Sequence, residues 1–353
     1  MNLVVGNEFG ELTPSLVSVV ICAYNNWPDL EMTIASALHQ SYGSLEVIVV
    51  DNSSTDATPQ EVPRRFGSCL RYLRQPNREC AGAYNTGFAL AHGEFIQFVD
   101  GDDVLAPNKI EKQLEVFRAS PQLDIVYGDV RTFQTLPGVA NWTDLAMTPQ
   151  NDMLATLTGP NGIWINTLGV LSRRIALEKV GPWDEDLYVE DADYWLRAAW
   201  CGCRFGYCPS SPMGFRRLRP GQKMSNFHKM EQGLEVVWGK ALRYVTREPY
   251  RSMLAAKIAD WRLRRAVFEN RIGTREALAN LSLAKAESPE TISALMYAAA
   301  WVTILIPGGR QLARLRCLGF MRHMLAPLLQ DHVAETSSGK NGSNLADTER
   351  SAL

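Results

Sequence analysis

The first hundred residues of the chain alternate between short apolar runs and segments that place apolar residues at helical intervals. The runs at 16–24, 45–51 and 95–99 are nearly all apolar, which is typical of strands buried on both faces of a sheet. Between them, residues 30–40 and 81–91 have helical spacing. Strands and helices that alternate in this way form right-handed βαβ units, so the pattern predicts an α/β fold with a mostly parallel sheet flanked by helices.

The pattern continues to about residue 220 and then changes. Further strands are expected at 125–131, 168–172 and, at a sheet edge, 204–207, whereas long helical stretches follow Ser225. We therefore expect four parts of the chain. These are an N-terminal extension at 1–14, an α/β domain at 15–224, a helical C-terminal region at 225–330, and a tail at 331–353 whose polar composition predicts disorder.

Two of the predicted strands end in aspartate, at Asp51 and at Asp100. Parallel strands bring their carboxyl ends to one edge of the sheet, which is where open α/β sheets bind ligands. Asp100 begins the run Asp100-Gly101-Asp102-Asp103, whose crowded carboxylates would be relieved by a divalent cation. Asp and Gly also favour plain turns, so these residues alone leave an acidic turn and a metal site equally open.

A second acidic cluster and a basic segment follow later in the chain. Glu190-Asp191 can supply a general base, although acids at a helix start also complement the helix dipole. The segment 215–223 carries Arg216, Arg217, Arg219 and Lys223, which suit phosphate groups or a solvated loop. Taken together, metal, base and cations form a site for displacing a diphosphate leaving group. Neither a Gly-x-Gly-x-x-Gly motif nor a P-loop follows the first strand, which disfavours a dinucleotide cofactor.

Composition narrows the classes of function further. The 353 residues include 36 Lys and Arg against 38 Asp and Glu, a net charge of −2 that argues against a nucleic-acid partner. The seven cysteines show no metal-ligand spacing, so we expect reduced thiols. Residues 1–14 lack the basic-then-apolar pattern of a signal peptide, so we expect a cytoplasmic protein.

One C-terminal segment leaves a membrane contact open. The apolar run at 292–306 is short for a spanning helix. It is followed by 310–322, where basic and apolar residues alternate at roughly helical spacing. A helix of this kind can lie on the inner face of a membrane as a peripheral contact, or it can pack on its own domain.

The ordered series of motifs over roughly residues 15–225 resembles the inverting glycosyltransferases of family 2, which have the GT-A (Rossmann-like) fold. The resemblance rests on the opening strand Val17–Asn25, the second strand Val47–Asp56, the Asp-x-Asp motif within Phe98–Asp103, and the turn and helix start within Val180–Arg197. Asn77-Arg78 and Ala83–Gly87 resemble the segment before the acidic motif.

This resemblance implies a nucleotide site. Ala23 and Tyr24 would border the base with Asn25 beside them, Asp51 would bind the nucleobase, and Asn85 would also belong to the nucleotide-binding set. The implied donor is a nucleotide sugar, with a UDP-sugar expected.

The resemblance also implies a metal and phosphate site. Asp100 would face the ribose or the metal, Asp102 would ligate Mg²⁺ or Mn²⁺, and Asp103 is the less certain ligand. Arg217 and Arg219 would contact the diphosphate. Many relatives have Arg-x-His here, whereas this chain has Arg217-Leu218-Arg219, so a guanidinium that cannot coordinate a cation replaces the His.

The implied activity is transfer of a sugar to an acceptor hydroxyl with inversion. Asp191 would be the base, with Glu190 as the fallback, and the acceptor would be a saccharide or lipid-linked molecule in surface polysaccharide or glycolipid assembly. Two alternatives stay open, namely a non-catalytic nucleotide-sugar-binding module of the same fold and another metal-dependent nucleotide-handling transferase. The presence of both acidic clusters argues against the binding module. The other transferase would not need the Glu190-Asp191 base at that position and usually has a basic Gly-rich loop near the first strand, which this sequence lacks.

Overall fold

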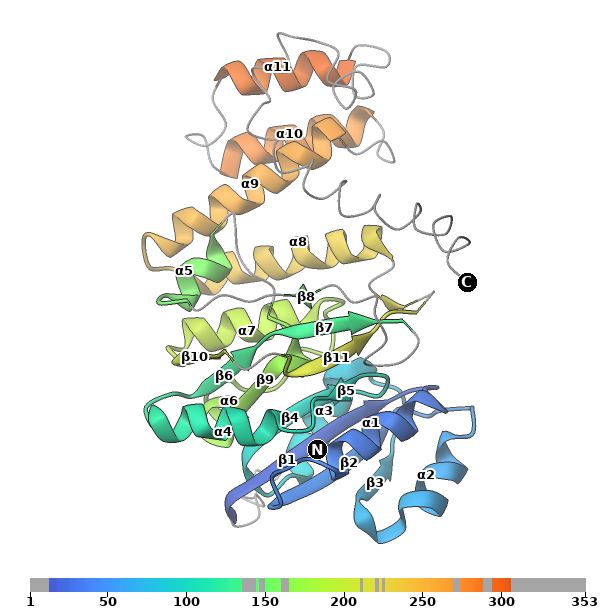
Figure 1. Ribbon diagram of the computed structural model, residues 1–353. Coiled ribbons are helices and arrows are strands. Elements are labelled where there is room, and N and C mark those ends of the chain that lie inside the picture. Colours follow the sequence, from blue (N-terminus) through green and yellow to red (C-terminus); the bar gives the residue numbers. More distant parts are fainter. Residues whose placement is uncertain are drawn as a thin grey trace, which may run out of the picture. The chain divides into compact units, whose positions relative to one another are not determined.

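A computed structural model of the chain describes residues 13–134, 144–145, 150–159, 165–209, 212–219, 222–223, 226–268, 274–287 and 294–305. The chain divides into two compact units, Met1–Thr246 and Arg247–Leu353 (Figure 1). Several predicted segments lie outside the described residues: the extension up to residue 12, the basic stretch 310–322 and the tail 331–353.

A seven-stranded sheet forms the centre of the first unit, in the order β10-β6-β9-β4-β1-β2-β3. Within it β9 runs antiparallel to its neighbours β4 and β6, and the other pairs are parallel. This confirms the predicted α/β class and the edge strand near residue 205. The strands are β1 (Thr13–Ala23), β2 (Leu45–Asp51), β3 (Arg71–Arg74), β4 (Gly93–Asp100), β6 (Ile125–Gly128), β9 (Val170–Arg173) and β10 (Phe205–Cys208).

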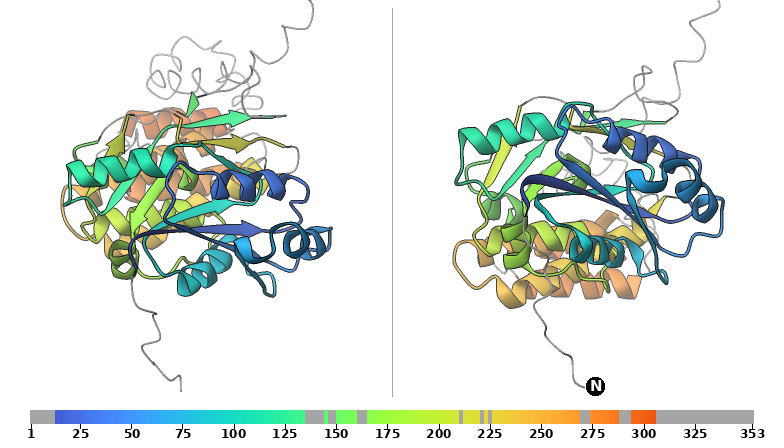
Figure 2. Two further views of the ribbon diagram at one scale, coloured as in Figure 1. Left: turned by 60° about the horizontal axis from the view of Figure 1, so that its bottom comes forward. Right: turned by 90° about the horizontal axis from the view of Figure 1, so that it is seen from below.

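Helices cover both faces of this sheet (Figure 2). Val19 and Ile21 of β1 point to one face, where they pack with Leu30 and other apolar residues of the flanking helices. Val20 points to the opposite face, where Gly87 lies so close that a Cβ atom there would be 2.2 Å from a Val20 methyl group. One face carries α1 (Asp29–Leu38), α2 (Thr58–Phe66) and α4 (Lys109–Ala119), and the other carries α3 (Glu79–Leu90), α6 (Arg174–Val180) and α7 (Glu190–Trp200).

A second, four-stranded sheet has the order β5-β11-β7-β8. Its strands are β5 (Val104–Leu105), β7 (Val130–Phe133), β8 (Asp144–Leu145) and β11 (Gly214–Arg217). Two predictions are corrected here. The single strand expected at 125–131 breaks at Asp129, because β6 stays in the main sheet while β7 joins the second one. The basic segment is partly a strand, which pairs in parallel with β7 and antiparallel with β5.

The remaining elements of the first unit are short connections and one long helix. They are the 3₁₀ turns η1 (Gly67–Cys69) and η2 (Thr167–Gly169), α5 (Met153–Thr158) and α8 (Phe227–Tyr244). The helix α7 begins at Glu190, so its first turn contains the acidic cluster itself.

The second unit contains α9 (Tyr250–Phe268), α10 (Thr274–Glu287) and α11 (Ala294–Leu305). Apolar residues from all three helices form its core, including Leu263, Leu281 and Ile304. Across the described part of the chain, no helix combines the length and the apolar character that a membrane crossing requires.

Candidate active site

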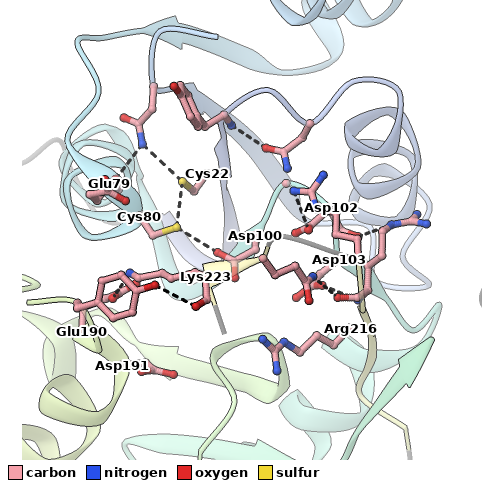
Figure 3. Close-up of a pocket in the computed structure, with 18 of the residues that line it drawn as sticks. Cys22, Glu79, Cys80, Asp100, Asp102, Asp103, Glu190, Asp191, Arg216 and Lys223 are labelled. Atoms are coloured by element: carbon pink, nitrogen blue, oxygen red, sulfur yellow. Dashed lines mark hydrogen bonds and ion pairs between the residues drawn. The ribbon is translucent and has the colours of Figure 1, made fainter. Parts of the chain in front are cut away.

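A cavity of about 310 Å³ opens at the carboxyl ends of β1 and β4. Its walls come from the end of β1, the turn after β4, the start of α3, the start of α7, and the residues in and after β11 (Figure 3). Strand register explains this meeting point, because Cys22 pairs with Asp100 and Ala23 pairs with Asp51 across neighbouring parallel strands. The two strand-end aspartates therefore lie at the same edge of the sheet, as the sequence predicts.

Asp100 is held at the end of β4 by two side chains from α3. Its Oδ1 atom accepts a hydrogen bond from the Tyr84 hydroxyl at 2.6 Å and a weaker one from the Cys80 thiol at 3.6 Å. The next residue, Gly101, approaches β1 closely: a Cβ atom there would lie 2.7 Å from the Cys22 carbonyl oxygen. The glycine thus lets the acidic turn fold back against the end of β1.

Asp102 and Asp103 face the basic strand β11. A carboxylate oxygen of Asp102 lies 3.0 Å from an Arg219 nitrogen, and Oδ1 of Asp103 accepts a hydrogen bond from the Arg217 backbone N–H at 2.9 Å. Burial and the charge of Asp100 raise the pKa of Asp102, which Arg219 partly offsets. Burial, followed by the charges of Asp102 and Asp100, raises the pKa of Asp103 well above its usual value.

The two predicted phosphate-binding arginines are engaged with acids of the same unit. Arg217 is buried, donates from Nε to the Asp102 carbonyl oxygen at 3.1 Å, and lies 3.3 Å from Asp29. Arg219 is more exposed, and its guanidinium contacts both Asp102 and Asp29. Arg217 therefore mainly fixes the acidic turn to β11, whereas Arg219 presents its guanidinium at the cavity.

The second acidic cluster lies on the opposite wall, in the first turn of α7. Glu190 forms an ion pair of 2.8 Å with Lys223. Asp191 accepts a hydrogen bond from the Ala192 backbone N–H, and among the described residues no ion pair includes it. Burial, followed by the charge of Glu190, raises the pKa of Asp191 to about 7. The two adjacent carboxylates thus differ in their electrostatic environment.

Asp191 also borders a smaller cavity of about 60 Å³ that adjoins the first. Arg216 lines both cavities, and its side chain extends between the two acidic clusters in Figure 3. Asp100 and Glu190 also border both. The groups predicted to hold the metal, the phosphates and the proton are therefore brought together around one space.

The predicted Mg²⁺ or Mn²⁺ has a partial set of ligands here. No group of three or more His, Cys, Asp or Glu in the described ranges is placed to hold a metal ion by itself. Asp100 and Asp102 nevertheless offer hard oxygen donors at the cavity, and burial, followed by the charge of Asp100, raises the pKa of Asp102. Such a pair fits Mg²⁺, which commonly takes one or two carboxylates and completes its shell with substrate phosphates and water.

Four predicted nucleotide-binding residues, Ala23, Asn25, Asp51 and Asn85, do not line the cavity. Ala23 is fully buried in the sheet, and Asn25 accepts a hydrogen bond from the Thr55 backbone N–H. Their predicted contacts with the nucleotide stay predictions, whereas Tyr24, Asp100, Arg217 and Arg219 do line it.

The side chains of Asp51 and Asn85 are satisfied within the protein. The Asp51 carboxylate is fully buried and accepts hydrogen bonds from the Ser54 N–H and the Tyr72 hydroxyl. Asn85 exchanges hydrogen bonds with the Trp183 backbone, which ties α3 to the loop before α7. In the structure, the side chains of both residues therefore stabilise the segments around the cavity.

The structure adds residues that the motif series does not identify. Cys22, Asn52, Cys80 and Tyr188 line the cavity, and Lys223 pairs with Glu190. The basic character of the segment 215–223 indicated Lys223 as a cation near the site, but its partner depends on how β11 and α7 pack. No spacing rule along the chain relates Cys22 to Cys80.

Comparison with known proteins shows which family part of this chain resembles. Residues 18–178 match the family described as Glycosyl transferase family 2. An uncharacterized glycosyltransferase of Nostoc sp. is 32% identical over 177 residues, which cover 48% of this chain and 54% of the relative. The UDP-Glc:alpha-D-GlcNAc-diphosphoundecaprenol beta-1,3-glucosyltransferase WfgD of Escherichia coli is 33% identical over 115 residues, or 32% and 45% of the two chains.

Solved structures agree on the fold. TarS 1-349 of S. aureus in complex with UDP-GlcNAc superposes with a TM-score of 0.59 at 17% identity, covering 82% of this chain and 90% of that TarS chain. The mannosyltransferase PcManGT of Pyrobaculum calidifontis, in complex with GDP-Man and Mn²⁺, gives a TM-score of 0.55 at 21% identity, covering 88% and 84%.

The match to glycosyltransferase family 2 thus covers residues 18–178, less than half of the chain, and the solved structures share its GT-A fold, as predicted from the sequence. The chain spans about half the length of the curated relatives it matches, 54% of the Nostoc protein and 45% of WfgD.

Proposed function

We propose that the protein is an inverting glycosyltransferase that moves a sugar from a nucleotide sugar to an acceptor hydroxyl. The observation that carries this proposal is the state of Asp191. Its carboxylate borders both cavities, has no ion-pair partner among the described residues, and has a pKa raised to about 7. A base whose pKa lies near the working pH is well suited to accept a proton during an attack.

In this mechanism Asp191 takes the proton of the acceptor hydroxyl as its oxygen attacks the anomeric carbon. The bond between that carbon and the diphosphate oxygen breaks on the opposite face of the sugar, so the configuration inverts. Glu190 is less suited to the role because Lys223 lies 2.8 Å from its carboxylate. The charge of Glu190 nevertheless adds to the effect of burial in raising the pKa of Asp191.

The diphosphate would lie between the two acidic clusters, where positive groups gather. Arg216 and Arg219 line the larger cavity, and guanidinium groups bind phosphate oxygens in a planar fork. A Mg²⁺ or Mn²⁺ ion held by Asp102 and Asp100, when bound, would stabilise the negative charge that develops on the leaving diphosphate. With Arg219 in place of a His, two carboxylates and the substrate would supply the ligands.

We infer that the donor is a UDP-sugar. WfgD is named for UDP-Glc, and TarS is seen with UDP-GlcNAc, whereas PcManGT holds GDP-Man. Tyr24 stands 47% exposed at the cavity and offers an aromatic face on which a base can stack. The roles of Ala23, Asn25, Asp51 and Asn85 in base recognition belong to this proposal.

We infer in the same way that the acceptor is a saccharide, lipid-linked in the manner of surface polysaccharide assembly. The name of WfgD specifies an acceptor on diphosphoundecaprenol, and this chain matches 115 of its residues. A lipid-linked acceptor would bring the protein to the inner face of a membrane. The predicted peripheral contact through the C-terminal helices fits that picture, although residues 310–322 lie outside the described ranges.

A donor screen tests the proposal directly. The protein would be heated with UDP-, GDP- and dTDP-sugars, each with Mn²⁺, with Mg²⁺ and with EDTA, and the best stabiliser would then be assayed for metal-dependent transfer. We expect a UDP-sugar to raise the melting temperature most, and NMR of the product to show the anomeric configuration opposite to that of the donor. Binding without transfer or hydrolysis of any donor would instead support the non-catalytic binding module.

A further inference from the structure

Two thiols meet on the wall of the larger cavity. The Sγ atoms of Cys22 and Cys80 lie 3.6 Å apart, and both residues line the cavity (Figure 3). Cys22 is buried at the end of β1, whereas Cys80 is partly exposed in the first turn of α3. The residues are 58 positions apart in the chain, so their contact results from the packing of α3 on the sheet.

The contact belongs to a chain of interactions that ends at the acidic turn. Asn52 donates from one amide nitrogen to the Glu79 carbonyl oxygen at 2.8 Å and to the Cys22 sulfur at 3.7 Å. The Cys80 thiol in turn donates to Asp100. Glu79, directly before Cys80, has a φ of 55°, a left-handed conformation that is uncommon for a residue with a side chain. The backbone at this point therefore holds Cys80 toward both Cys22 and Asp100.

We propose that Cys22 and Cys80 form a modification site for two-electron oxidants such as hydrogen peroxide, and that the resulting disulfide weakens nucleotide binding in the cavity. Cys80, the more accessible sulfur, is oxidised first: one peroxide oxygen adds to its sulfur to give a sulfenic acid, and water leaves. The Cys22 sulfur then displaces that hydroxyl group, so that an S–S bond forms and a second water leaves. A thiol reductant reverses the change by exchange.

Forming the disulfide requires the two sulfur atoms to move closer together and removes the hydrogen bond from Cys80 to Asp100. A disulfide bond is about 2.05 Å long, so the two sulfurs must approach by roughly 1.5 Å. Cys80 then no longer has a proton to donate to Asp100. Groups that bond to a metal-binding carboxylate tune its affinity, and their loss typically costs about 10- to 100-fold. The consequence for nucleotide binding rests on the function proposed above, whereas the disulfide itself does not.

The environment of Cys80 predicts that the reaction is slow. The neighbouring Cys22 thiol, followed by burial, raises the pKa of Cys80 well above its usual value, so the protonated thiol predominates. Because the thiolate is the reactive species, the exposed thiol of Cys69 should react first.

Peptide mass spectrometry of the full chain tests the modification. After oxidation with hydrogen peroxide and alkylation, a nonreducing digest should contain a peptide pair that joins Cys22 to Cys80, and dithiothreitol should separate it. Cys69→Ser is the matched control and should retain the cross-link. Cys80→Ser should abolish the cross-link while its hydroxyl keeps a donor for Asp100. Absence of the Cys22–Cys80 peptide pair from the oxidised wild type would overturn the proposal.

Calorimetry with UDP and Mn²⁺ tests the effect on the site. We expect oxidation to weaken binding of UDP about tenfold or more in the wild type and in Cys69→Ser, with recovery after reduction. Cys80→Ser should keep the same affinity before and after peroxide. If the cross-link forms and UDP affinity does not change, the site is not redox-controlled. If the reduced protein binds no nucleotide in the donor screen, the proposed function fails while the peptide result still decides the modification.

Discussion

The two acidic clusters at the cavity differ in how their charges are balanced. At the end of β4, all three carboxylates have partners on other elements: Tyr84 and Cys80 for Asp100, Arg219 for Asp102, and the backbone of β11 for Asp103. In the first turn of α7, Lys223 neutralises Glu190 and leaves Asp191 without an ion pair among the described residues.

This difference assigns different chemistry to the two clusters. Carboxylates that are fixed from several sides and repel one another are suited to share a cation. A single carboxylate whose pKa is raised to about 7 is suited to exchange a proton. The clusters have similar residues, so the partners supplied by β11, α3 and Lys223 are what separates the binding role that we propose for one cluster from the catalytic role that we propose for the other.

The sharpest way to separate the two roles is to neutralise Asp102. Asp102→Asn removes a proposed metal ligand, so we expect affinity for UDP in Mn²⁺ to fall about 100-fold and to approach the affinity measured in EDTA. Isothermal calorimetry of both conditions measures this. Glu115→Gln, on the exposed surface of α4, serves as the control and should bind like the wild type. An unchanged metal dependence would remove Asp102 from the metal site.

The second prediction concerns the charge balance in the α7 cluster. Asp191 is surrounded by Glu190, Lys223, Asp100 and Arg216, and Lys223 lowers its pKa while the two carboxylates raise it. Lys223→Met should therefore raise the pKa of Asp191 further. Because the deprotonated base is active, the acid limb of kcat/KM should move to higher pH, with a loss of roughly tenfold below that limb.

A conservative variant shows whether the effect of Lys223 is electrostatic. Lys223→Arg retains the positive charge beside Glu190 and should leave the acid limb near its wild-type position. If Lys223→Met lowers the rate equally at every pH, Lys223 acts through local structure and not through the base.

The third prediction concerns the cost of the β4 cluster in the metal-free protein. The pKa of Asp103 is raised on folding, so its contribution to stability is present below the unfolded value near 4 and is lost as pH rises through the folded pKa. Asp103→Asn keeps an oxygen that can accept from the Arg217 N–H and removes the buried charge. In EDTA at pH 8 we expect the free energy of unfolding to rise by about 1 kcal/mol.

The pH dependence provides the check on that gain. Urea denaturation should show the gain shrinking toward zero as the pH falls below the unfolded value near 4, where Asp103 becomes protonated in both states. Asp186→Asn, an exposed acid in the loop before α7, should show no comparable gain at either pH. A loss of stability in Asp103→Asn at pH 8 would mean that the charge itself holds β11 in place.

Much of the fold of the first unit could be predicted from local patterns of apolar residues in the sequence. The buried strands at β1, β2 and β4 are short apolar runs, and parallel pairing then places Asp51 and Asp100 at one edge. The break of the expected strand 125–131 at Asp129 could not be predicted, because continuous apolar residues do not show which sheet each half joins.

The site was only partly predictable for a similar reason. The series of motifs along the chain predicted that Asp100, Asp102 and Asp191 belong to one site, and all three line the cavity in the structure. Whether a polar side chain faces a ligand or the protein depends on its tertiary partners. Asp51 accepts a hydrogen bond from Tyr72, and Cys22 meets Cys80, and both contacts join segments whose spacing in the sequence carries no signal.

Turnover and binding by Asp191→Asn test the central claim most directly. With the best donor from the screen, we expect kcat to fall about 1,000-fold while calorimetry shows the affinity for UDP and Mn²⁺ within about twofold of the wild type. Asp186→Asn, in the neighbouring loop, should match the wild type in both measurements. If Asp191→Asn retains turnover within about tenfold of the wild type, Asp191 is not the base and the division between the two clusters is wrong.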